Sequence, residues 1–84
     1  MEETNPFLGE QIIEVVRNQI RANDPPQTKQ TYERLLKEGH AEDDVMKMLG
    51  CAAVAEIYYV MKEKKPFNEA RYVAMLNALP TLPE

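Results

Sequence analysis

One stretch near the middle of the chain constrains the fold most, because it predicts a long helix that is apolar on two sides. Residues 41–65 begin with acidic side chains and end with lysines, as suits a helix macrodipole, and Pro66 follows. On a 3.6-residue helical wheel, one broad apolar face contains Met46, Leu49, Ala53, Ile57, Val60 and Met61. A second strip, roughly opposite, contains Met48, Ala52, Ala55 and Tyr59. Such a helix must be covered on two sides, by its own chain or by another copy.

Two further helices are predicted before this stretch. Asn5 and Pro6 suit the N-cap and first position of a helix over about residues 6–23, with apolar residues at every fourth position. The repeating residues are Leu8, Ile12, Val16 and Ile20. A second helix over about residues 25–38 is expected to start from a capping box of Asp24 and Gln27 and to end at Gly39.

A fourth helix is predicted over about residues 69–79, capped by Asn68. Phe67 and Tyr72 stand at the spacing of a hydrophobic staple around this cap. No alternating run of β-branched residues indicates a strand. We therefore expect an all-α fold, a small four-helix bundle-like domain around a long central third helix, forming a single domain over residues 1–84.

Composition narrows the functional classes. The net charge is −4 and the pI is near 5.0, which argues against binding to nucleic acid or to an anionic membrane. A helix-turn-helix is also disfavoured, because the second helix would present Asp43 and Asp44 to DNA phosphates. The single cysteine excludes an intramolecular disulfide, and neither a signal peptide nor a transmembrane segment is recognisable. We expect a cytoplasmic protein.

Few residues suggest chemistry. His40, the only histidine, follows Gly39 at a turn between helices and is interpreted as a surface residue. Cys51 lies among small residues and is interpreted as a core residue. Glu10 and Glu14 are one turn apart but lack the Glu-x-x-His pair of bundle metal sites. The sequence thus predicts no catalytic residue, no cofactor and no metal, and an enzymatic activity is not expected.

Glu56 is the exception, since it is a carboxylate within an apolar stretch. A buried carboxylate must reach water or find a cationic partner, and Arg17 and Arg71 are the candidates. We expect Glu56 to form a structural, buried ion pair.

Several short motifs resemble a known family. They are Asn5-Pro6-Phe7-Leu8, Arg17-x-Gln19, Pro25-Pro26, Arg34-Leu35 and Leu49-Gly50. Over roughly residues 5–60 the chain resembles a family of small uncharacterised bacterial all-helical proteins, catalogued as a domain of unknown function. Members of that family carry histidines where this chain has Gly9, Ile13 and Asp43, so a site built from those histidines would be missing here. The resemblance implies a helical fold and no mechanism.

Two functional hypotheses remain open. The first is a protein-interaction module that associates with itself as a homodimer, or with another protein. Its predicted interface is the second strip: Met48, Ala52, Ala55 and Tyr59. The alternative is a bundle that binds a small apolar ligand, or an enzyme of unrecognised type, with a pocket lined by methionine and tyrosine.

Overall fold

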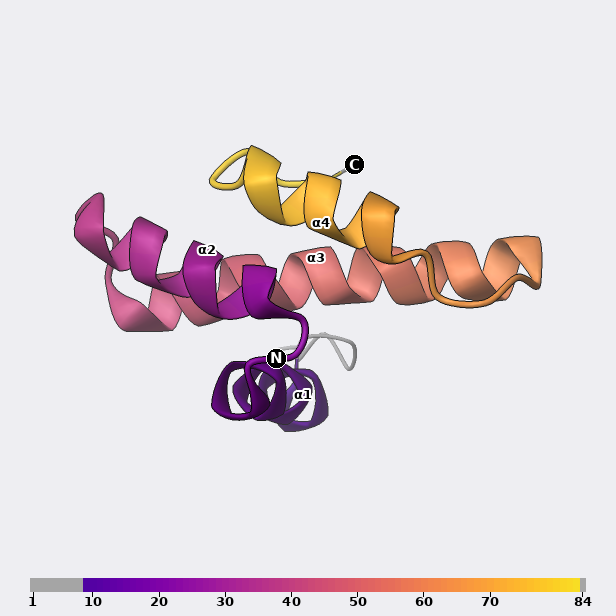
Figure 1. The fold of residues 1–84 in the computed structure, drawn as a ribbon, viewed down its shortest axis with the longest axis horizontal. Coiled ribbons are helices and arrows are strands. Elements are labelled where there is room, and N and C mark those ends of the chain that lie inside the picture. The colour runs from indigo at the N-terminus through magenta and orange to yellow at the C-terminus, as the bar shows by residue number, and fades with distance from the viewer. Residues whose placement is uncertain (1–8, 84) are drawn as a thin grey trace, which may run out of the picture.

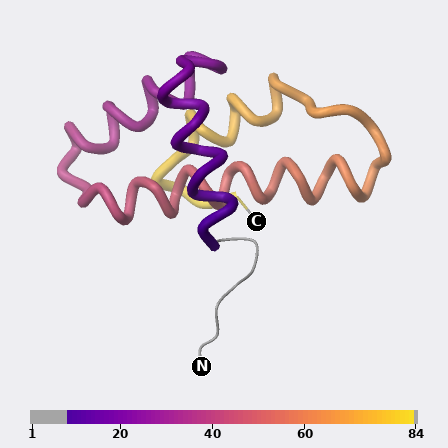
Figure 2. Tube along the Cα trace, turned by 90° about the horizontal axis from the view of Figure 1, so that it is seen from below, coloured from indigo at the N-terminus to yellow at the C-terminus, as the bar shows by residue number. Residues whose placement is uncertain are grey.

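The computed structural model describes residues 9–83 and contains four α-helices (Figure 1). They are α1 (Glu10–Ala22), α2 (Pro26–Lys37), α3 (Glu42–Glu63) and α4 (Glu69–Ala78). The predicted all-α fold around a long third helix is confirmed. At about 1.5 Å per residue, α3 is roughly 33 Å long and contacts each of the other three helices. Figure 2 shows α2 and α4 on the same side of α3, one towards each end, with α1 crossing near the middle.

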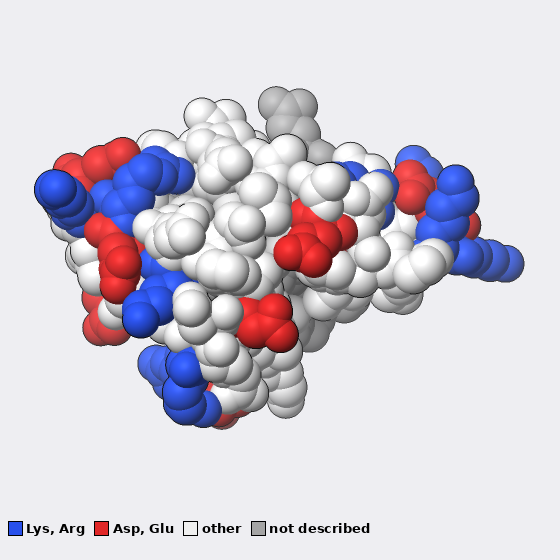
Figure 3. Space-filling view, in the orientation of Figure 1, with Lys and Arg blue, Asp and Glu red and all other residues white. Residues whose placement is uncertain are grey.

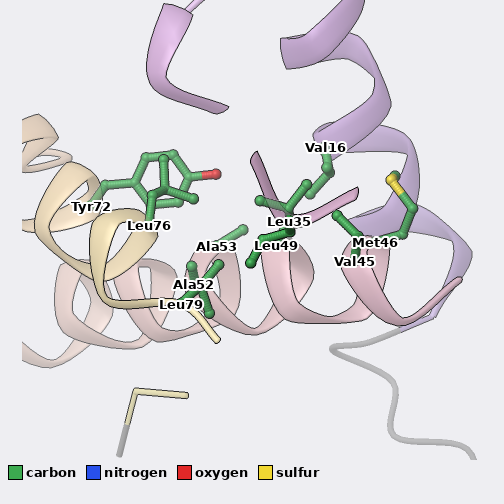
Figure 4. Close-up of a cluster of buried hydrophobic side chains, with 10 residues drawn as sticks. All are labelled: Val16, Leu35, Val45, Met46, Leu49, Ala52, Ala53, Tyr72, Leu76 and Leu79. Carbon is green, nitrogen blue, oxygen red and sulfur yellow. The ribbon is translucent and has the colours of Figure 1, made fainter. Parts of the chain in front are cut away.

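The core lies where the inner face of α3 meets the other three helices. It is a cluster of Val16, Leu35, Val45, Met46, Leu49, Ala52, Ala53, Tyr72, Leu76 and Leu79 (Figure 4). All four helices contribute to it, so none of them buries its apolar residues alone. Burying one large apolar side chain stabilises the fold by about 1.5–3 kcal/mol, so each large side chain of this cluster contributes on that order.

The starts of α1 and α2 differ from expectation. Gly9 is the N-cap of α1, so the helix begins at Glu10; the expected cap Asn5 and the expected helical residues 6–8 lie outside the described residues. The capping box of Asp24 and Gln27 is wrong. Because Pro25 occupies the N-cap position of α2, Asp24 precedes the cap, and the Thr28 N–H donates to the Pro25 carbonyl at 3.1 Å instead.

The predicted residues at the end of α2 and the start of α4 are confirmed, whereas α3 ends at Glu63, before the predicted end at Lys65. Gly39 follows α2 with a left-handed φ of 103°, and the N–H of His40 donates to the Leu35 carbonyl at 3.2 Å. At the start of α4, the side chain of Asn68 accepts a hydrogen bond from the Arg71 N–H at 3.0 Å. The rings of Phe67 and Tyr72 meet edge to face with centroids 5.4 Å apart, as the staple requires.

Candidate interaction surface on the outer face of α3

The structure covers part of the predicted interface strip from within the chain. Ala52 is fully buried in the core cluster with Leu76 and Leu79 and cannot contact a second molecule, so its predicted place in an interface is wrong. Met48 packs against the same cluster. The physical reason is that the chain turns back after α3, so that Leu76 of α4 and the following Leu79 pack in one cluster with Ala52 (Figure 4).

The two remaining members of that strip, Ala55 and Tyr59, are half-buried. The guanidinium carbon of Arg71 lies 4.6 Å from the centroid of the Tyr59 ring, a cation–π contact between α4 and α3. Tyr59 therefore helps to hold α4 in place.

Large apolar side chains are exposed elsewhere on α3. Met61 is 66% exposed and Tyr58 is 57% exposed, while Val54 and Cys51 are half-buried. These four residues follow i, i+3, i+7, i+10 spacing and so form one stripe along the helix. We call Cys51, Val54, Tyr58 and Met61 the outer strip. It lies on the side of α3 that faces away from the core residues Val45, Leu49 and Glu56.

The outer strip borders a shallow hollow of about 380 Å³. The hollow is lined by Val54, Ile57, Tyr58, Met61 and Lys62, all of which belong to α3. The Lys62 ammonium lies 5.8 Å from the centroid of the Tyr58 ring, and the Tyr58 and Tyr59 rings meet edge to face at 5.5 Å. The surface is thus mainly apolar, with a lysine at its edge.

Opposite charges gather at the two ends of α3. Its first turn contains Glu42, Asp43 and Asp44, and its end is followed by Lys64 and Lys65, all exposed. Figure 3 shows blue side chains, with a few red ones among them, where α3 ends, at the right of the view. The outer strip therefore lies between an acidic end and a basic end.

Glu56 is fully buried and bonded through both carboxylate oxygens. Arg71 donates to it through Nε at 2.7 Å and through Nη2 at 3.0 Å, and the Asn68 N–H donates at 2.8 Å. The hydrogen bonds from Arg71 lower the pKa of Glu56, against the opposing effect of burial. Of the two partners that the sequence suggested, the structure brings Arg71 to Glu56. The arrangement ties α4 and its preceding turn to α3.

The other residues that the sequence suggested for chemistry are His40, Glu10, Glu14 and Cys51. His40 lies at the turn after α2, with Nε2 3.9 Å from Glu38, and Glu10 and Glu14 are exposed on α1. The interpretation of Cys51 as a core residue is wrong, because Cys51 is half-buried on the outer side of α3. Partial burial still raises the pKa of its thiol, which lowers its reactivity. Within residues 9–83, no three His, Cys, Asp or Glu side chains gather closely enough to hold a metal ion. In the same part of the chain, no helix combines the length and apolarity needed to cross a membrane.

Sequence reasoning missed a polar cluster inside the molecule. The Gln19 side-chain oxygen accepts hydrogen bonds from Thr28 at 2.9 Å and from the hydroxyl of Tyr72 at 2.8 Å. These residues come from α1, α2 and α4, and both Thr28 and Tyr72 are fully buried. No local spacing links them, so no sequence signal could have found the cluster. The outer strip, in contrast, has a recognisable spacing in the sequence.

Comparison with protein families gives a match. Residues 1–78 match the model of a protein family described as "Domain of unknown function (DUF1841)". No match to a curated protein or to a solved structure was found.

Proposed function

We propose that this chain, which belongs to the DUF1841 family of domains of unknown function, is a protein-interaction module that associates with itself through the outer strip of α3. The observation that carries the proposal is the pair of exposed side chains Tyr58 and Met61, 57% and 66% exposed and three residues apart on one helix. Contiguous exposed apolar patches mark interaction sites, whereas single exposed apolar residues are normal on any protein surface.

The shape of the surface favours a protein partner over a small ligand. Sites for small molecules are concave and enclose about 70–90% of the ligand surface. Among residues 9–83, the hollow beside the outer strip is lined by α3 alone, so within this part of the chain nothing encloses a small molecule from its other side. A helix of a second molecule would instead cover the whole stripe.

The test is the mass of the full chain by light scattering on a sizing column over a concentration series. We expect a dimer that dissociates on dilution. Met61→Ser should raise the dissociation constant of the dimer about tenfold or more. The reason is that Met61 would be buried in the dimer interface, and losing a buried apolar side chain costs about 1.5–3 kcal/mol. Tyr58→Ser should act in the same direction.

Val15→Ser is the matched control, because Val15 is 41% exposed on α1 and lies outside the outer strip. This variant should dimerise as the unsubstituted chain does. Circular dichroism should show that all variants remain helical. A mass that stays monomeric at every concentration would contradict the proposal.

A further inference from the structure

The charges at the ends of α3 distinguish the two possible orientations of a second copy. A parallel pair would place Asp43 and Asp44 of one copy beside the same residues of the other, and likewise the lysines at the far end. An antiparallel pair brings each acidic end towards the basic end of its partner and also opposes the helix macrodipoles favourably. Exposed ion pairs are individually weak. The charges at the helix ends therefore favour the antiparallel orientation but add little to the affinity of the dimer.

The spacing of the residues in the outer strip then determines the register, that is, which residues of the two copies face each other. In an antiparallel pair centred at the height of Glu56, Val54 faces Tyr58 of the partner and Cys51 faces Met61. Each pair joins a smaller side chain to a larger one, which lets two helices approach closely without leaving voids. All four apolar residues of each copy are covered in this register, and a shift by one turn would leave some of them exposed.

The ends of the pair are compatible with this register. Because α3 ends at Glu63, Lys64 and Lys65 lie beyond the paired helices, near the level of Lys47 of the other copy; all three side chains are exposed and long enough to turn outward. Asp43 and Asp44 lie one turn before Lys47 on the same helix. They are within reach of the lysines of the other copy and offset the repulsion between those lysines and Lys47.

We propose that two copies of this chain pair through antiparallel α3 helices related by a two-fold axis, with Val54 against Tyr58 and Cys51 against Met61. The inference rests on the proposed self-association and specifies its partner as a second copy in one orientation and register. A two-fold axis makes the contact self-complementary and closes the assembly at a dimer.

Disulfide crosslinking tests the arrangement. Three forms of the full chain are compared: the unsubstituted chain with Cys51 alone, Cys51→Ser with Met61→Cys, and Met61→Cys with Cys51 retained. In the proposed register, residue 51 of one copy lies about 15 Å along the helix axis from residue 51 of the other copy, and the same holds for residue 61. This separation exceeds the Cα–Cα limit of roughly 7 Å for a disulfide. We therefore expect a covalent dimer only from the form that carries both cysteines.

Met61 is exposed, so its substitution should leave the fold intact, and Val15→Cys with Cys51 retained is the matched control that should not crosslink. Mild oxidation at alkaline pH allows for the raised pKa of the Cys51 thiol. Covalent dimers from either single-cysteine form would indicate another orientation and overturn the inference while leaving self-association standing. A monomer by light scattering before oxidation would overturn both.

Discussion

At the scale of single residues, Glu56 shows how a charge can be buried without being reactive. Its two oxygens accept three hydrogen bonds, two from Arg71 and one from the backbone of Asn68. Removing one partner from such a pair leaves an uncompensated group in the interior, which is costly. The ion pair of Glu56 and Arg71 therefore fixes the position of α4 against α3.

Glu56→Gln tests this role. The substitution keeps the shape but removes the charge that Arg71 bonds, and hydrogen bonds to charged groups contribute about 1.5–3 kcal/mol. We expect the free energy of unfolding in urea to fall by about 2 kcal/mol.

The control is Glu63→Gln, because Glu63 bonds the same arginine at 3.1 Å but its side chain is 39% exposed. An exposed pair contributes about 0–1 kcal/mol, so this variant should lose much less stability. Equal losses from both variants would argue against a special role for the buried carboxylate.

At the scale of elements, the turn between α2 and α3 depends on the backbone of Gly39. Its φ of 103° lies in the left-handed region, and a Cβ built there would meet nothing within 4 Å. The cost of adding a Cβ at this position therefore comes from backbone conformation and not from crowding.

Gly39→Ala should accordingly lower the free energy of unfolding by about 1 kcal/mol, measured by urea denaturation. Gly39→Asn should lose less, because asparagine tolerates the left-handed region better. Lys37→Ala, at an exposed helical position in the same segment, should be close to neutral. An Ala variant as stable as the unsubstituted chain would show that the turn relaxes to another conformation.

At the scale of the whole molecule, buried ionisable groups predict how stability depends on pH. The pKa of Glu56 is lowered on folding, chiefly by the hydrogen bonds from Arg71. The stability that it contributes is therefore present above its ordinary pKa of 4.5 and is lost as the pH falls through the lower folded value. Burial raises the pKa of Tyr72, so its contribution is present below 10.0 and is lost at higher pH.

Urea unfolding over a pH series should show declining stability on both the acidic and the alkaline side. Below about pH 4.5 the decline should be shallower for Glu56→Gln than for the unsubstituted chain, because the variant lacks this titrating group. Parallel acid curves for the two proteins would assign the acid loss to other carboxylates.

The sequence by itself predicts the local features of this protein. Helical periodicity, the Asn68 cap, the staple of Phe67 and Tyr72 and the closing Gly39 depend on residues within a few positions of one another, so spacing alone predicts them. The same periodicity showed that α3 is apolar on more than one side, and the charge of Glu56 indicated that it needs a partner.

Only the tertiary structure decided which sectors of α3 are covered. A helical wheel gives the direction of each side chain, but coverage depends on where the other helices pack. The end of α4 returns over Ala52 and buries it, whereas Tyr58 and Met61 stay open to solvent. The choice of Arg71 for Glu56 and the meeting of Gln19, Thr28 and Tyr72 were decided in the same way, because each joins residues of different helices and depends on how those helices pack.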